Sequence, residues 1–299
     1  MTRALVIGRR RPGRKIAEAV SETGQRLEAA GWTVDRAVVD RKGELRKRTR
    51  RAIKAQVDVV VAVGGDGAVS QVVQRLAGTQ VALGIVPMGT GNLLAGNLGI
   101  PKRQDDAIDL LLTDGRRRID LGLLTIDGKH KDFAVACGIG FDAVVMKSTG
   151  KRGKRRWGKL AYVVNAIKNH GHVKDVPHQI TIDGVHSVMD ATQVFIANFG
   201  GMGLPMEPRL EIHPDDGVLD VIVVSASGPL PGLVAGWEAL RQRRLGKSSG
   251  GRVFRARGRE VTVETDPSRL VEIDGSVVGT TPIKATIRPA ALTVIVPPK

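Results

Sequence analysis

The sequence has little cysteine and few aromatic residues. Its single cysteine, Cys137, excludes an intramolecular disulfide and a cysteine-built metal centre. Because Cys137 lies in the apolar run 133–137, we expect a buried, unreactive thiol rather than a nucleophile. Aromatic residues make up only 3% of the 299 residues, so valine, leucine, isoleucine and alanine must fill the core. The predicted strands lack aromatic platforms for stacking bases, which argues against a specific nucleic-acid partner.

Long apolar runs are also missing. No segment approaches the roughly 18 uninterrupted apolar residues that a membrane span needs. The apolar stretch at residues 1–7 is too short for a signal-peptide core, and arginines follow it. We therefore expect a cytoplasmic protein whose membrane contact is peripheral, at the inner membrane surface. The length of 299 residues favours two domains.

Positive charge predominates, and the formal net charge is +16. Such an excess attracts polyanions, including lipid headgroups. Residues 41–54 carry eight basic side chains and residues 151–159 carry six. The first cluster also fits a solvated helix face. The second is a glycine-containing loop, and it is the preferred candidate for contact with an anionic membrane.

The most informative stretch is residues 57–67, where a run of β-branched residues ends in Gly64, Gly65, Asp66 and Gly67. This pattern predicts a buried strand with a turn at its carboxyl end, where open α/β sheets bind ligands. Glycines let backbone N–H groups approach phosphate oxygens, and a helix from Ala68 onward would add the positive end of its dipole. Taken alone, the pattern equally fits a tight turn with a solvated aspartate.

A second segment repeats this arrangement. Residues 82–87 have the pattern of a buried strand, and the glycine-rich run 88–101 follows, with Gly89, Thr90 and Asn92 near its start. Two neighbouring strand-to-loop turns can form the two sides of one phosphate-binding crevice.

The two segments together resemble the diacylglycerol kinase catalytic-domain family, which includes bacterial lipid kinases and is related to sphingosine kinases. NAD kinases and phosphofructokinases share a GGDG turn, but the second segment favours the lipid-kinase branch. Further resemblance runs along most of the chain, at residues 138–143, 158–162, 214–221 and 272–276.

The resemblance implies an ATP-dependent lipid kinase that transfers the γ-phosphate to the hydroxyl of diacylglycerol or a similar lipid alcohol. ATP and Mg²⁺ are the implied cofactors, and a membrane lipid is the implied substrate. The residues expected to hold phosphates, through backbone amides or side-chain hydrogen bonds, are Gly64, Gly65, Gly67, Gly89, Thr90 and Asn92. Asp66 is the expected catalytic residue, as magnesium ligand or general base. Asp216 is expected to hold a structural magnesium, as the family's Asp-Gly turn does in some bacterial members; such a turn also forms without metal.

Three positions depart from the family pattern. Ser276 stands where much of the family has a glutamate, the proposed base in bacterial members. Either Asp66 is the base here, or activity is weak or lost. Ala68 replaces a threonine, and residues 8–14 (GRRRPGR) replace an Asn-Pro. The arginines of this segment could pair with phosphates or be solvated. A kinase of a soluble substrate and a catalytically impaired lipid or nucleotide sensor are therefore the alternatives.

Residues 1–117 alternate strand and helix patterns, which predicts a Rossmann-like ATP-binding domain with a parallel sheet. Residues 118–299 read as successive strands and predict an antiparallel β-sandwich lipid-binding domain, with helical insertions near 160–168 and 230–245. We expect the active site in the cleft between the domains, and an exposed strand edge could support a homodimer. Asp-Gly pairs at 127–128 and 183–184 signal hairpins. The strands predicted for this half are 119–126, 131–137, 179–182, 191–198, 219–224, 261–264, 270–273 and 292–296.

Overall fold

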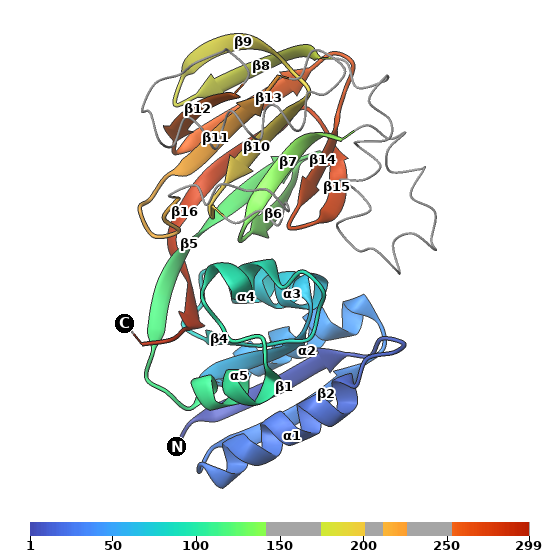
Figure 1. Ribbon diagram of the computed structural model, residues 1–299, viewed down its shortest axis with the longest axis vertical. Coiled ribbons are helices and arrows are strands. Elements are labelled where there is room, and N and C mark those ends of the chain that lie inside the picture. Colours follow the sequence, from blue (N-terminus) through green and yellow to red (C-terminus); the bar gives the residue numbers. More distant parts are fainter. Residues whose placement is uncertain (142–174, 201–211, 226–252, 299) are drawn as a thin grey trace. The chain divides into compact units, whose positions relative to one another are not determined.

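The computed structural model describes residues 1–141, 175–200, 212–225 and 253–298 (Figure 1). The basic loop 151–159, the motif 158–162 and the predicted helices 160–168 and 230–245 lie outside these residues. The chain forms two compact units, residues 1–121 with 288–299, and residues 122–287. The first unit thus includes the C-terminal segment, which the boundary predicted at 117/118 placed with the second domain.

The first unit is a parallel sheet with the strand order β2-β1-β3-β4. Its strands are β1 (Arg3–Arg9), β2 (Thr33–Val39), β3 (Val59–Gly64) and β4 (Ala82–Pro87). Every residue of β3 and β4 is buried, as expected for parallel strands covered on both faces. The end of β16 (Ile283–Ile295) adds a further parallel partner to β4, at the pair Val294 and Leu83.

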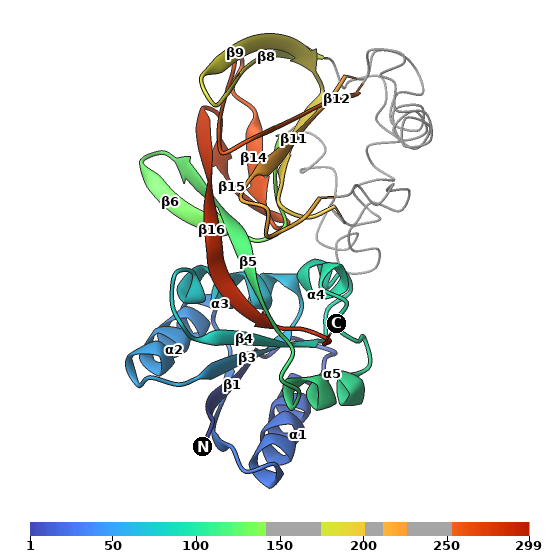
Figure 2. The same cartoon turned by 90° about the vertical axis from the view of Figure 1, so that its left-hand side faces the viewer.

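Helices cover both faces of this sheet. They are α1 (Ile16–Ala29), α2 (Lys42–Lys54), α3 (Asp66–Leu76), the short α4 (Leu93–Asn97) and α5 (Gln104–Leu111). Helices α1 and α5 pack on one face, and α2 and α3 on the other (Figure 2). The predicted Rossmann-like arrangement is confirmed. Because β1, β3 and β4 are adjacent and parallel, the loops at their carboxyl ends meet at one edge.

The second unit consists of antiparallel strands in two sheets. One sheet has the order β12-β11-β10-β7-β14-β15. The other contains the order β16-β13-β8-β9. In this second sheet the β5–β6 hairpin pairs with β16 through β5. The strands are β5 (Arg116–Ile126), β6 (Lys129–Phe133), β7 (Ala136–Phe141), β8 (Val176–Ile182), β9 (Val185–Ala191), β10 (Gln193–Ala197), β11 (Leu219–Val224), β12 (Val253–Gly258), β13 (Glu260–Thr265), β14 (Leu270–Ile273) and β15 (Ser276–Thr280). The predicted antiparallel β-sandwich is confirmed.

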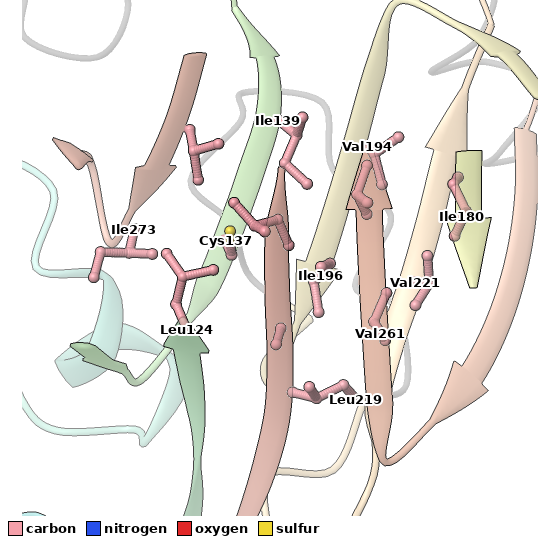
Figure 3. Packing of buried hydrophobic residues seen from close by; sticks show 14 of the residues in the cluster. Leu124, Cys137, Ile139, Ile180, Val194, Ile196, Leu219, Val221, Val261 and Ile273 are labelled. Carbon is pink, nitrogen blue, oxygen red and sulfur yellow. The ribbon is translucent and has the colours of Figure 1, made fainter. Parts of the chain in front are cut away.

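The core of the second unit lies between its two sheets (Figure 3). Ile139 and Val194 come from one sheet, and Leu124 and Val261 from the other; each is fully buried. Burial of such side chains contributes about 1.5–3 kcal/mol each, which compensates for the scarcity of aromatics. Cys137 belongs to the same cluster and has no exposed surface, so the predicted buried thiol is confirmed.

Both hairpin signals are confirmed. Asp127-Gly128 joins β5 to β6 and Asp183-Gly184 joins β8 to β9, with positive φ at all four residues. One predicted strand was wrong because it spans a crossing between the sheets. Residues 131–137 divide into β6 and β7, which pair in different sheets. The strand predicted at 191–198 corresponds to β10, Gln193–Ala197.

Candidate active site

The first glycine turn connects β3 to α3. Gly64 ends the strand, Gly65 is the N-cap in an extended conformation, and the helix begins at Asp66, two residues before the predicted start. The first N–H groups of such a helix have no partner within it and carry the positive end of its dipole. A Cβ on Gly65 would lie 2.8 Å from the Cα of Gly89. The first turn therefore touches the second, and glycine permits this approach.

The second turn is closed by its own asparagine. The Asn92 Oδ1 accepts the Gly89 N–H at 2.8 Å, and the Asn92 Nδ2 donates to the Gly89 carbonyl at 3.0 Å. Asn92 has a φ of 48°, in the left-handed region that asparagine tolerates well. We expected Asn92 and the Gly89 amide to contact phosphate, but in this structure they bond each other. These two bonds set the shape of the loop, and the phosphate contacts of both residues stay predictions.

Asp66 ties the two turns together. Its Oδ2 accepts the N–H of Asn92 at 3.0 Å, and its Oδ1 accepts the N–H of Leu93 at 2.5 Å. The carboxylate is partly buried at the start of α3 and holds the first turn of α4. Asp66 is thus a positioning residue whatever else it does. The sequence carried no signal for this contact, because it joins residues 26 and 27 positions apart.

A pocket opens where three strand ends meet. It is lined by the turn residues Gly64, Gly65, Ala68, Met88, Gly89 and Thr90 and by Arg9, Arg11, Arg14 and Ile16 from the region after β1. None of these lining residues is acidic. The Arg14 Nη2 donates to the Thr90 Oγ1 at 3.3 Å. Gly67 lies beside the pocket, since a Cβ there would be 3.7 Å from the Arg11 Nη2.

The arginines are held close together. Burial, and secondarily the charge of Arg11, lower the pKa of Arg9 from its usual value. The Nε of Arg9 is buried and has no hydrogen-bond partner among the described residues. Within the same residues, neither Arg9, Arg11 nor Arg14 forms an ion pair with a carboxylate. Arg9 is partly buried, whereas the side chains of Arg11 and Arg14 are exposed.

The predicted magnesium residue, Asp216, has other partners. Its Oδ1 accepts the Val218 N–H at 3.2 Å, and its Oδ2 pairs with Arg257. The buried Asp220 forms ion pairs with Arg255 at 2.6 Å and with Arg257 at 3.5 Å. Asp216 and Asp220 are therefore each paired with guanidinium groups, an arrangement that does not fit a magnesium ion at Asp216. Among the described residues no group of three His, Cys, Asp or Glu side chains could hold a metal ion.

The Asp-Gly pair at 274–275 makes a hairpin turn between β14 and β15, with φ values of 46° and 77°. The Asp274 carboxylate accepts the N–H groups of Ala134, Val135 and Ala136 at 2.9, 2.8 and 3.3 Å. It thereby stabilises the crossing between β6 and β7. Ser276 begins β15 and is exposed. Sequence analysis missed this structural role, although the turn signal was the same as at 127–128.

Comparison with known proteins agrees with the fold. The diacylglycerol kinase catalytic domain family matches residues 3–124, and the YegS C-terminal NAD kinase beta sandwich-like domain matches residues 135–296. The architecture is that of a two-domain lipid-kinase fold. The chain belongs to the diacylglycerol kinase family, as the two turns predicted.

Individual relatives carry lipid-kinase names. The chain is 31% identical to a diacylglycerol kinase of Mycobacterium tuberculosis over 210 residues, 67% of this chain and 66% of that protein. It is 29% identical to a probable YegS-like lipid kinase of Pseudomonas putida over 270 residues, 89% of this chain and 86% of that protein. An uncharacterised Synechocystis protein is 28% identical over 87% of this chain, which spans 60% of that protein's length.

Solved structures share the fold. A putative diacylglycerol kinase from Bacillus anthracis superposes with a TM-score of 0.81 and 23% identity, covering 99% of this chain and 95% of that one. Within the part of this chain that the structure describes, no helix is long and apolar enough to cross a bilayer.

Proposed function

We propose that this chain is an ATP-dependent lipid kinase that transfers the γ-phosphate of Mg-ATP to the hydroxyl of diacylglycerol or a similar lipid alcohol. The observation that carries the proposal is the pocket at the ends of β1, β3 and β4, with glycine backbones, three arginines and no acidic lining residue. Family membership supports the same activity. Phosphoryl transfer depends mainly on positioning and charge neutralisation, and the glycine backbones and arginines of this pocket support a role in both.

In this proposal the residues around the pocket have different roles. The N-terminus of α3, with Gly65 and Gly67, offers backbone donors for phosphate oxygens. Asp66 keeps the second turn in place and, as the acidic residue nearest the pocket's glycines, is the candidate for orienting magnesium or the acceptor hydroxyl. Magnesium bound with ATP would neutralise charge on the phosphates. We assign Asp216 a structural role: it stabilises the region of β11 and β12 through its ion pair with Arg257.

The direct test is transfer of labelled γ-phosphate from Mg-ATP to lipids in mixed micelles. The panel holds diacylglycerol, monoacylglycerol, ceramide, sphingosine and phosphatidylglycerol, with a no-lipid control. A labelled lipid confirms the kinase and names its acceptor. Transfer that does not depend on lipid would favour a soluble acceptor, the first alternative.

A sensor of the same fold is the second alternative, and Ser276 is the observation behind it. Ser276 is exposed and supplies no carboxylate where much of the family has one. Nucleotide binding without turnover on any acceptor would favour the sensor and contradict the kinase. The Ser276→Glu variant refines the test: we expect activity equal to or above that of the natural chain, whereas a large loss would mean that Ser276 has a role of its own.

We also propose that the protein docks on anionic membranes through basic patches, of which helix α2 is the described example. Leu45, Thr49 and Ala52 anchor this helix and are buried. Its exposed side chains include six basic residues that form no ion pair with other described residues: Arg46, Lys47, Arg48, Arg50, Arg51 and Lys54. Each basic residue near an anionic leaflet contributes about 1 kcal/mol. The loop 151–159 stays a further candidate.

Vesicle co-sedimentation tests the docking. Replacing Lys47, Arg51 and Lys54 by glutamine should weaken binding to vesicles containing phosphatidylglycerol by about tenfold or more. The control removes equal charge from scattered exposed sites, at Lys102, Arg116 and Lys129, and should change binding much less. Equal losses in both triple variants would contradict a role for α2. A homodimer through an exposed strand edge, such as β9, stays a prediction for mass measurement in solution.

A further inference from the structure

Strand β9 is an edge strand of the second unit. It ends the order β16-β13-β8-β9, and within the described residues β8 is its one pairing partner (Figure 1). An edge strand presents a row of N–H and C=O groups to which another strand can pair. Proteins usually prevent such pairing with lysines and other charges, with proline or with a bulge.

The other edge strands in the described part of the chain carry such protection. The pairing of β15 with β14 skips Val278, as in a β-bulge. Strands β2, β6 and β12 carry charged side chains, namely Asp35 and Arg36, Lys129 and Lys131, and Arg255 and Arg257. Strand β9 has no lysine, arginine or proline, and its pairing with β8 is regular. It is therefore the least protected edge.

The side chains of β9 add an apolar contact surface. Val185 is 70% exposed and Val188 62%, more than any other large apolar side chain of the described residues except the terminal Met1. Met189 and Ala191 pack against the core. Because side chains alternate along a strand, residues 186, 188 and 190 point to the opposite face, and all three are exposed.

The hairpin determines which main-chain groups of β9 are directed to the free edge. Its two-residue turn, Asp183-Gly184, has φ values of 47° and 84° and closes with a hydrogen bond between the flanking residues Ile182 and Val185. Bonded and non-bonded residues then alternate along the pair. The odd-numbered residues of β9 thus bond β8, and the main-chain groups of residues 186, 188 and 190 are directed to the edge.

We propose that β9 pairs with β9 of a second copy of this chain, antiparallel about a two-fold axis at Val188. Val188 then lies opposite Val188 of the second copy, and His186 lies opposite Asp190, twice by symmetry. All three residues with edge-directed main-chain groups are used. A shift of the register by two residues would place Val188 opposite a polar side chain and separate His186 from Asp190. The strand thus complements itself, as a two-fold interface requires.

The distribution of charge favours the same face. Two copies with a net charge of +16 repel each other over most of their surface. Residues 175–208 contain no lysine or arginine, although the chain has 46 of them. The β8–β9 hairpin is therefore a face on which two copies can approach with little repulsion. The proposal adds a strand, a register and pairing residues to the homodimer expected from sequence, and it does not rest on the proposed kinase activity.

The first test is the mass of the full chain in solution over a series of concentrations. We expect a concentration-dependent dimer. Val188→Lys places two ammonium groups opposite each other at the axis and should weaken the dimer by about tenfold or more. Val277→Lys is the control, because Val277 is an exposed valine on another edge strand, β15; it should change the dimer by less than about twofold. Thermal melts verify that each variant is folded.

Charge variants test the register. His186→Asp places two carboxylates opposite each other in each outer pair, and Asp190→Lys places a lysine opposite His186, so each variant alone should dimerise more weakly. A mixture of the two variants should form heterodimers more tightly than either variant alone, because each outer pair again contains a carboxylate and a basic group.

A cysteine pair measures the same register directly. A short thiol-to-thiol crosslinker should join two copies of Val188→Cys, whose positions lie opposite each other. Val185→Cys should not be joined, because an offset of six residues separates its two copies by about 20 Å. Cys137 is fully buried and does not compete.

Three outcomes overturn the inference. The first is a monomer at every concentration. The second is a dimer that Val277→Lys dissociates and Val188→Lys does not, since its interface lies elsewhere. The third is a dimer in which Val185→Cys crosslinks as readily as Val188→Cys, or in which the mixed charge variants associate no better than either alone. None of these measurements requires phosphate transfer, so failure of the proposed kinase would leave the inference standing.

Discussion

Replacing Gly89 by alanine would force the two glycine turns apart. A Cβ there would lie 2.5 Å from the Cα of Gly65 and 2.6 Å from the Oδ1 of Asn92. Carbon atoms in contact normally lie about 3.5–4.0 Å apart, so one turn must move by about an ångström. Gly65 cannot retreat without shifting the start of α3, and Asn92 cannot turn without breaking both of its bonds to Gly89. Such overpacking typically costs about 1–3 kcal/mol.

If the strain is relieved by opening the pocket, the same energy weakens nucleotide binding by about 5- to 150-fold. Calorimetry gives the dissociation constant, and urea unfolding shows whether the cost falls on stability instead. Gly96→Ala is the matched control: it lies in the same glycine-rich segment, on α4, and an added Cβ would meet nothing within 4 Å. Gly89→Ala with the natural affinity and the natural unfolding midpoint would refute the reasoning.

Three further predictions concern the second unit. Asp274→Ala leaves three main-chain N–H groups without their acceptor and should lower the free energy of unfolding by at least about 1–3 kcal/mol in urea; an unchanged midpoint would contradict this. Burial lowers the pKa of His178, so its neutral form is favoured in the native state, and stability should fall as pH drops below the ordinary value of about 6.5. Thermal melts at pH 7.5 and 5.5 should show a smaller difference in His178→Gln. Burial, and then the charges of Glu272 and Asp274, raise the pKa of Cys137, so a thiol reagent should label it only after unfolding; rapid labelling of the native chain would refute this.

The local sequence pattern was sufficient to predict the parallel sheet of the first unit and its two glycine turns. A run of β-branched residues that stops at glycine is a short-range signal, and two such runs in series predict adjacent parallel strands. The meeting of Gly65 and Gly89 follows from that topology, because neighbouring parallel strands end at the same edge. The Asp-Gly hairpins were predictable for the same reason, since two residues with positive φ define the turn.

Roles that depend on contacts across the fold were not predictable. Asp66 reaches the backbone of residues 92 and 93, and Asn92 folds back on Gly89; neither contact leaves a periodic trace. The strand boundary near 134 was missed because the apolar run 133–137 continues while the chain changes sheets. The sequence of segment 8–14 shows that arginines are present but not where their side chains lie. The strand order β2-β1-β3-β4 places β1 next to β3 and so brings these arginines beside the glycine turns.

The Asp66→Asn variant tests whether Asp66 acts on the reacting groups or only holds the second turn in place. Activity alone cannot separate these two roles, so nucleotide affinity must be measured as well. The amide presents a donor where the carboxylate accepts the N–H of Asn92 or Leu93, so one of these two hydrogen bonds is lost. That loss costs about 1–3 kcal/mol and loosens the second turn. If nucleotide affinity stays within about twofold while phosphate transfer disappears, Asp66 acts on the reacting groups. If affinity and transfer fall together, the residue acts by holding the turns. Full activity would remove Asp66 from the site altogether, because neither role tolerates the exchange.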